Sequence, residues 1–230
     1  MNILAVDTAL GACSVAITVD GRIRAHTYRE MVRGHAEALA PMVEAAMGEA
    51  GCTFAQLDRL GVTTGPGTFT GQRVGLAFIR AMALALNIPA VGVTTLDAMI
   101  EAALDEDDAP WVVTAIDAKR GEVYLGARGA NGNVLIEPVL MGVRCAAGQL
   151  VERARAAGPD FLCAGTGAEL LLPELAAKGL KARLSAVRQP DAAFVARLVL
   201  RATPSGAPPR PLYLRAPDAK LPATGLSGRR

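Results

Sequence analysis

One stretch indicates the fold more strongly than any other: Leu60-Gly61-Val62-Thr63-Thr64-Gly65-Pro66-Gly67-Thr68-Phe69-Thr70-Gly71. Its β-branched start predicts a buried strand, and a helical segment over residues 72–86 follows. Gly65-Pro66-Gly67 is a tight-turn pattern, and Thr70 is placed to cap the helix. Such a helix start can hold an anion on its backbone N–H groups. The spacing favours the simpler interpretation that the glycines only turn the chain, and no Lys follows as a P-loop requires.

The helix expected over residues 72–86 carries little charge. Its only polar side chains are Gln72, Arg73 and Arg80. At 100° per residue, Arg73 and Arg80 fall on one stripe with apolar flanks. The flanking residues are Leu76, Ala77, Ala83 and Leu84. A surface helix of a monomer normally carries more charge, so we expect this helix to be covered on two sides.

Composition narrows the class of protein. The 230 residues suffice for one large domain or two small ones. Hydrophobic residues make up 51% and the mean hydropathy is +0.30, so we expect part of the apolar surplus at an interface. No run reaches the ~18 apolar residues of a membrane span, and the N-terminal residues lack the basic start of a signal peptide. A net charge of +2 gives little long-range attraction for nucleic acid.

The cysteines show no CxxC spacing and lie in apolar contexts. This pattern is typical of reduced core residues in a cytoplasmic protein. They are Cys13, Cys52, Cys145 and Cys163.

The chain repeats one order of elements. The first half predicts strands over residues 3–7, 13–19 and 22–28, a helix over 35–50, a strand over 60–64 and the helix over 72–86. The second half predicts strands over residues 111–117, 122–128 and 134–139, a helix over 146–157, a strand over 160–164 and a helix over 168–175. Each half begins with an apolar strand that ends in an acid, Asp7 or Asp117. Further helices are expected after Thr94 and over residues 191–202.

The order βββαβα, given twice, is the plan of the actin-like ATPase (ASKHA) fold, an α/β fold with two lobes. An acidic run over residues 105–108, followed by Pro110, marks the expected boundary. We therefore expect an N-terminal lobe over residues 1–108 and a C-terminal lobe over residues 109–213. Residues 214–230 are expected to form an extended tail.

Four segments resemble the TsaB (YeaZ) family, and together they span nearly the whole chain. They are residues 3–8, 65–75, 117–124 and 211–215, of which the Gly-Pro-Gly-Thr-Phe-Thr-Gly motif is the most specific. The resemblance implies an actin-like fold and a cytoplasmic role in forming N6-threonylcarbamoyladenosine at position 37 of tRNAs that read codons beginning with A.

The resemblance also implies partners. In this family the protein is a non-catalytic subunit that docks a related TsaD-like subunit, which carries the metal, the nucleotide and the chemistry. A TsaE-like ATPase is a further expected member of the complex. Homodimers through the same surface, only indirect contact with tRNA and no membrane contact are implied as well.

The residues argue against a metal site. In TsaD-like relatives, the segment matching residues 92–99 carries two histidines four residues apart. Here Thr95 and Met99 occupy those places, and both are poor ligands for hard or borderline cations. The only histidines are interpreted as a structural residue, His26, and as helix-start packing, His35. We expect neither a bound metal nor a cofactor.

The turn after the first strand is poorly suited to phosphate. Actin-like kinases place small residues and a hydroxyl there, whereas this chain has Leu10. Asp7 and Thr8 stay weak candidates for a nucleotide or magnesium contact, with turn stabilisation as the simpler role. Asp117 has the same simpler role, and the motif at residues 165–167 (Gly-Thr-Gly) is too short to define a site. We expect no catalytic residues, because no nucleophile, base and charge stabiliser come together.

Two functions of different classes remain open. One is a scaffold and activating subunit for a TsaD-like enzyme, and the other is a stand-alone actin-like enzyme, either a small-molecule kinase or a metallopeptidase. A third function, direct tRNA docking, depends on scattered arginines that are usually solvated surface. These are Arg120, Arg128, Arg144, Arg210, Arg215, Arg229 and Arg230.

The docking surface is expected on the helices over residues 35–50 and 72–86. Such a pair can pack against the same pair from a partner, with charged edges that set orientation more than affinity. The expected interface residues are Glu37, Pro41, Glu44 and Gly48 on the first helix and Arg73, Leu76, Ala77, Arg80 and Leu84 on the second. The alternative is that Leu84 packs inside its own lobe.

Overall fold

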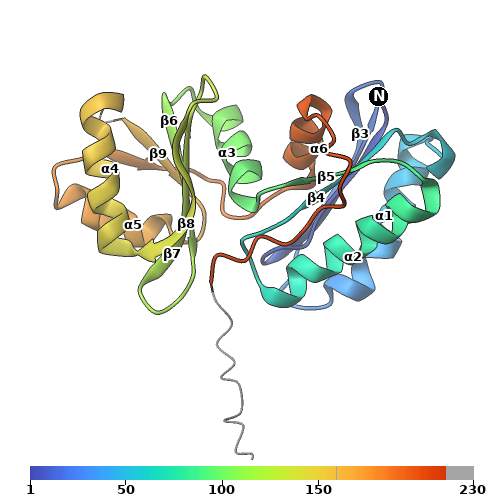
Figure 1. Cartoon of the computed structure of the whole chain (residues 1–230), viewed down its shortest axis with the longest axis horizontal. Coiled ribbons are helices and arrows are strands. Elements are labelled where there is room, and N and C mark those ends of the chain that lie inside the picture. Colours follow the sequence, from blue (N-terminus) through green and yellow to red (C-terminus); the bar gives the residue numbers. More distant parts are fainter. Residues whose placement is uncertain (159, 216–230) are drawn as a thin grey trace, which may run out of the picture.

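The computed structural model describes residues 1–158 and 160–215, which form two lobes side by side (Figure 1). Each lobe is built on a five-stranded mixed sheet. Alternate residues of the central strands point to opposite faces, and both faces are covered by helices. This arrangement confirms the predicted α/β architecture with a duplicated βββαβα order.

The first lobe follows the predicted order closely. Its elements are β1 (Ile3–Asp7), β2 (Ala12–Val19), β3 (Arg22–Glu30), α1 (His35–Ala50), β4 (Arg59–Thr63), α2 (Phe69–Leu86) and β5 (Ala90–Val93). The strands lie in the order β3-β2-β1-β4-β5, with β1 antiparallel to β2 and parallel to β4. Leu4 and Val6 of β1 belong to the core under α1 and α2, whereas Ile3 and Ala5 face α6.

The second lobe repeats the plan. Its elements are β6 (Trp111–Asp117), β7 (Glu122–Gly129), β8 (Val134–Gly142), α4 (Val143–Ala157), β9 (Phe161–Ala164), α5 (Ala168–Ala176) and β10 (Ala182–Leu184). The strand order is β10-β9-β6-β7-β8. Val113 and Ala115 of β6 pack with the core on the α4 and α5 side, and Val112 packs with α3 on the opposite face.

Two helices are exchanged between the lobes. Helix α3 (Thr95–Glu106) comes from the first half of the chain but packs on β6 and β9 of the second sheet. Helix α6 (Ala192–Arg201) comes from the second half but packs on β1, β2 and β4 of the first sheet. The two helices also contact one another in the middle of the molecule (Figure 1). Arg201 pairs there with Glu101, and Arg197 pairs with Asp105, each at 2.6 Å.

Helix α6 belongs to the predicted second segment of the chain, residues 109–213, but packs on the first sheet. The apolar residues Val195 and Val199 of α6 pack on the face of the first sheet that α1 and α2 leave open. Asp191 caps the helix by accepting a hydrogen bond from the Ala193 N–H at 2.8 Å. The predicted division between residues 108 and 109 stays a prediction, and it concerns segments of the sequence. In space, α3 of the first segment packs on the second sheet, and α6 of the second segment packs on the first sheet.

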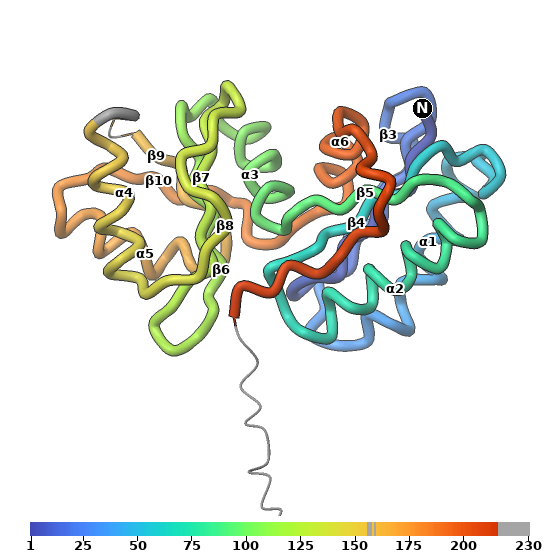
Figure 2. The backbone as a smooth tube through the Cα atoms, in the orientation of Figure 1, coloured from blue at the N-terminus to red at the C-terminus, as the bar shows by residue number. Residues whose placement is uncertain are grey.

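After α6, the chain returns along the first lobe toward the space between the lobes (Figure 2). The Leu212 N–H donates to the Thr64 carbonyl at 2.8 Å, and Arg215 pairs with Glu122 of the second lobe at 2.6 Å. We call residues 203–215 the C-terminal strap. Most of the tail expected over residues 214–230 lies outside the described residues.

Two local expectations are corrected, and two short elements were not predicted. Thr68, not Thr70, caps α2, because its hydroxyl accepts from the Gly71 N–H at 3.1 Å and the helix begins at Phe69. Cys145 is exposed on α4, whereas Cys13, Cys52 and Cys163 are buried as predicted. The short strand β10 and a 3-10 turn at Phe54–Gln56 were not predicted. Within the described residues, no helix is long and apolar enough to cross a membrane.

Candidate functional site

Asp7, at the end of β1, is completely buried. Its Oδ1 accepts hydrogen bonds from the Thr63 hydroxyl and from the Ala9 N–H, the latter at 3.2 Å. Its Oδ2 has no hydrogen-bond partner among the described residues. Burial raises the pKa of Asp7 to about 7, against the lowering effect of the Thr63 hydrogen bond. The carboxyl group is therefore sealed inside the lobe rather than presented at a strand edge.

Thr8 is equally committed to the fold. Its hydroxyl donates to the Gly71 carbonyl at 2.7 Å and accepts from the Gly75 N–H at 3.0 Å. A Cβ added at Gly71 would lie 2.2 Å from the Thr8 carbonyl oxygen, and one at Gly67 would lie 2.4 Å from the Ala9 carbonyl oxygen. The glycines thus do more than turn the chain, because they let the 65–71 loop lie directly against the β1 turn.

Three further backbone groups of the β1 turn are bound by other parts of the chain. The Thr68 N–H donates to the Ala9 carbonyl at 2.8 Å. The Gly11 N–H donates to Oε1 of Gln189 at 3.0 Å, and Nε2 of His35 lies 3.1 Å from the Leu10 carbonyl. The Gly11 N–H, the donor among these groups, is therefore already bound within the chain.

Leu10, at the β1 turn, contacts an apolar cluster between the lobes. The buried residues of this cluster are Leu96, Met99 and Ile116. Thr95 is fully buried, and its N–H donates to the Gly65 carbonyl at 2.8 Å. The positions that hold histidines in TsaD-like relatives therefore lie in packed core. The described residues contain no group of three or more His, Cys, Asp or Glu side chains arranged to hold a metal ion.

Both histidines have structural contacts, in accord with their interpretation. His26 lies on β3 with Nε2 2.7 Å from Oδ1 of Asp191, and this hydrogen bond raises the pKa of His26. His35, the first residue of α1, is buried against the Leu10 carbonyl. Neither histidine belongs to a metal-binding cluster within the described part of the chain.

The second lobe repeats the closed turn. Asp117 accepts from the Lys119 N–H at 2.8 Å and pairs with the Lys119 ammonium at 2.6 Å, and these contacts lower the pKa of Asp117. The Asp117 N–H donates to the Thr166 hydroxyl at 3.1 Å. A Cβ at Gly165 would lie 2.2 Å from the Ala115 carbonyl oxygen. Asp117 and the 165–167 motif are thus turn-forming groups in this structure.

The face formed by α1 and α2 is open to solvent, unlike the closed turns after β1 and β6. Most of the predicted interface residues are exposed there. Leu84 is 85% exposed, which excludes the alternative that it packs inside its own lobe. Leu76 is only 4% exposed and belongs to the core under the sheet, so its place among the predicted interface residues is wrong. The other exposed members are Glu37, Pro41, Glu44, Gly48, Arg73, Ala77 and Arg80.

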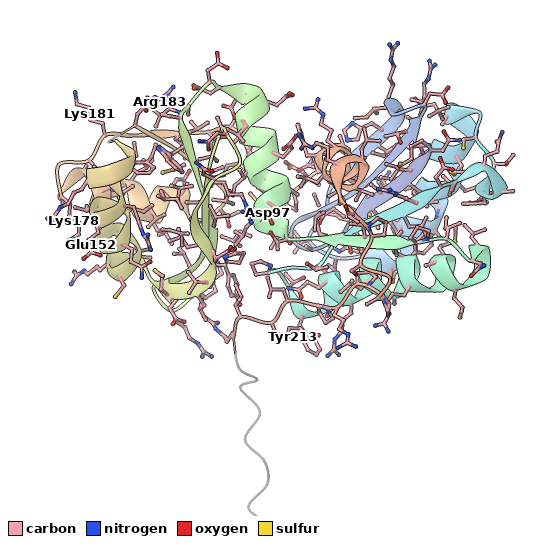
Figure 3. All side chains as sticks on the ribbon, turned by 45° about the horizontal axis from the view of Figure 1, so that its top comes forward. Asp97, Glu152, Lys178, Lys181, Arg183 and Tyr213 are labelled. Atoms are coloured by element: carbon pink, nitrogen blue, oxygen red, sulfur yellow. The ribbon has the colours of Figure 1, made fainter. Side chains whose placement is uncertain are left out.

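Two residues of this face were missed in the sequence. Phe69 is 62% exposed at the start of α2, and Tyr213 of the C-terminal strap is 50% exposed beside it. Their rings stack with centroids 6.3 Å apart. In Figure 3 the labelled Tyr213 side chain lies where the strap passes α2. The spacing of Phe69, Arg73 and Ala77, four residues apart, was the available pattern, and placing the helix start at residue 72 hid it.

A groove of about 710 Å³ runs between the C-terminal end of α2 and the strap. It is lined mainly by apolar and small residues, which include Ala81, Leu84 and Ile88 on one side and Gly206 and Pro208 on the other. The groove continues the exposed face of α2 toward its C-terminal end. We call the exposed residues of α1 and α2, together with Tyr213, the helical face.

The described arginines considered for tRNA docking lie on the second lobe and on the C-terminal strap. Arg128 pairs with Asp97 of α3, Arg144 lies 3.5 Å from Glu174, and Arg215 pairs with Glu122. Arg120 and Arg210 are exposed, whereas Arg229 and Arg230 lie outside the described residues.

Two sheets in duplicated order, joined through exchanged helices, define an actin-like protein with closed strand-end turns and an exposed helical face. The family model for TsaD, tRNA N6-adenosine threonylcarbamoyltransferase, matches residues 27–162. The tRNA threonylcarbamoyladenosine biosynthesis protein TsaB of Escherichia coli is 40% identical over 124 residues, which cover 54% of this chain and 53% of that protein. This chain therefore matches about half the length of that relative.

Two further relatives match over nearly their whole length. An uncharacterized protein of Mycobacterium tuberculosis is 37% identical over 221 residues, covering 95% of this chain and 94% of that protein. The solved structure of YeaZ from Pseudomonas aeruginosa superposes with a TM-score of 0.73 at 28% identity, covering 93% of this chain and 99% of that one. The chain belongs to the TsaB (YeaZ) family.

Proposed function

We propose that this chain is a non-catalytic scaffold and activating subunit in the biosynthesis of threonylcarbamoyladenosine in tRNA, and that it docks a TsaD-like catalytic subunit. The observation that carries the proposal is the helical face. Leu84 is 85% exposed on a helix whose other exposed residues include Ala77 and Ala81, and Arg73 and Arg80 are its exposed charged residues. Helix α2 therefore offers an apolar surface edged by two arginines. Contiguous exposed apolar surface of this kind is typical of a protein interface.

The closed strand-end turns support a non-catalytic role. A nucleotide would need free N–H donors and an accessible carboxylate at the end of β1. Asp7 is fully buried, the Thr8 hydroxyl is bound to α2, and the Ala9 and Gly11 N–H groups are donated to the chain itself. We therefore infer that Asp7 and Thr8 bind neither nucleotide nor magnesium, and that the catalytic residues lie on the partner.

The alternative is a stand-alone actin-like enzyme, a small-molecule kinase or a metallopeptidase. It requires the interlobe centre to open and expel Leu10 from its apolar cluster. ATP hydrolysis and metal content of the purified protein test this alternative directly. We expect no ATP turnover above a buffer control and no stoichiometric zinc or iron. One tightly bound metal ion per chain would instead support the stand-alone enzyme.

Further members of the assembly follow from the same proposal. The helical face serves either a TsaD-like subunit or a second copy of this chain, a TsaE-like ATPase joins the assembled complex, and tRNA is contacted only indirectly. The arginines support indirect contact, because Arg128, Arg144 and Arg215 are already paired with acids of this chain.

Depletion of the protein tests its role in the pathway. Mass spectrometry of tRNA nucleosides should show loss of threonylcarbamoyladenosine on depletion. Wild-type protein and the Asp7→Asn variant should both restore it, since Asp7 has no chemical role in the proposal. Unchanged modification after depletion would refute the pathway assignment. A folded Asp7→Asn variant that fails to complement would instead indicate a catalytic carboxyl group.

A further inference from the structure

Arg73 is held in one orientation before any partner arrives. Its Nε donates to the hydroxyl oxygen of Tyr213 at 3.1 Å, and its Cζ lies 3.5 Å from the centroid of the Phe69 ring. The Phe69 ring in turn stacks on Tyr213. The two contacts fix the plane of the guanidinium group and occupy Nε. Its two terminal nitrogens form no hydrogen bond or ion pair with any described residue, and the side chain is exposed on α2.

An arginine fixed in this way suits one kind of ligand. The two terminal NH₂ groups of a planar guanidinium match the two oxygens of a carboxylate, and little side-chain entropy is lost when the fork is already ordered. Surface arginines without such support usually contribute little to binding. The support here comes from a residue remote in sequence, since Tyr213 lies on the C-terminal strap.

The helical face itself carries the complementary groups. Glu37 and Glu44 are exposed on α1, and neither forms an ion pair with any described residue. Arg73 and Arg80 are exposed on α2. In a twofold-symmetric contact, the basic edge of one copy can meet the acidic edge of the other, because both copies present the same surface.

We propose that Arg73, positioned by Tyr213 and Phe69, binds a carboxylate on α1 of a second copy of this chain, Glu37 or Glu44, when two helical faces pack together. This inference rests on the proposed function for the location of the docking surface. The inference assigns Arg73 as the residue that sets the orientation of the two copies. It also gives the C-terminal strap a role in binding, because Tyr213 positions Arg73.

The experiment measures self-association of the full chain by sedimentation velocity. Arg73→Glu should weaken dimerisation about 10- to 100-fold, because it places like charges in contact. Tyr213→Phe keeps the ring but removes the hydrogen-bond acceptor, and it should weaken dimerisation about 3- to 10-fold. Combining Arg73→Glu with Glu37→Arg and Glu44→Arg should restore association to within about 3-fold of wild type. Circular dichroism of each variant checks folding.

The matched control is Arg153→Glu, an equal charge reversal at an exposed arginine of α4, which should leave the dimer unchanged. Wild-type affinity in Arg73→Glu, or failure of the charge swap to restore it, overturns the inference. If Arg73→Glu dimerises normally while Leu84→Glu does not, the docking face stands and only the role of Arg73 fails. If Arg73→Glu abolishes tRNA binding in a filter-binding assay but leaves dimerisation unchanged, the Arg73 guanidinium group binds phosphate and the proposal is wrong.

Discussion

Replacing Gly71 by Ala should strongly destabilise this protein, because the added Cβ has no space. It would lie 2.2 Å from the Thr8 carbonyl oxygen and 2.6 Å from the Thr68 hydroxyl oxygen. The first contact is with backbone, so the 65–71 loop must move away from the β1 turn. Overpacking of this kind costs about 1–3 kcal/mol, and loss of the Thr68 cap costs about 0.5–2 kcal/mol more. The expected loss in the free energy of unfolding is therefore about 1.5–5 kcal/mol.

The matched control is Gly148→Ala in the middle of α4. A Cβ there meets no atom within 4 Å, so the change should stabilise the helix by about 0.5–1 kcal/mol. Urea denaturation followed by circular dichroism measures both variants. If Gly71→Ala is as stable as wild type, the loop does not lie against the β1 turn in solution. The closed strand-end turn would then be refuted.

Three further predictions concern buried and exposed groups. Because burial raises the pKa of Asp7 from its ordinary 3.8 to about 7, the folded state binds the extra proton, and stability should fall as pH rises from about 4 to about 7. That fall, up to about 4 kcal/mol, should be absent from urea titrations of Asp7→Asn. The Asp191 hydrogen bond raises the pKa of His26, so the stabilisation by this pair is complete below pH 6.5 and is lost as the pH rises above the pKa of His26 in the folded protein. His26→Gln should therefore cost more stability at pH 6 than at pH 9. Leu76→Ala truncates a core residue and should lower the free energy of unfolding by about 2–5 kcal/mol. Leu84→Ala should change it by less than about 0.5 kcal/mol, because Leu84 is exposed. Equal losses of the two variants in thermal denaturation would contradict the assigned exposures.

The repeated order of elements could be predicted because periodicity and turn residues are local properties of the chain. The predicted bounds of residues 3–7, 35–50 and 111–117 agree with β1, α1 and β6. The exchange of α3 and α6 could not be predicted in the same way. An amphipathic helix fits either sheet, and its place depends on which face the other helices leave open.

The candidate sites show the same limit. Thr8 and Gly71 are 63 positions apart in the chain, so their hydrogen bond is invisible to any local pattern. Leu76 and Leu84 both flank the arginine stripe, and only the position of the sheet buries one and exposes the other. Tyr213 reaches Arg73 across 140 positions, which is why its part in the helical face was missed.

Capture of the TsaD-like subunit tests the central claim most directly. The two proteins of the same organism are co-expressed with a tag on the TsaD-like subunit, and the captured complex is resolved by gel filtration. We predict that the wild-type chain is captured in stoichiometric amount, and that the folded double variant Arg80→Glu with Leu84→Glu is not. Absence of the wild-type chain from the captured complex, or equal capture of the folded double variant, would contradict the proposed docking role.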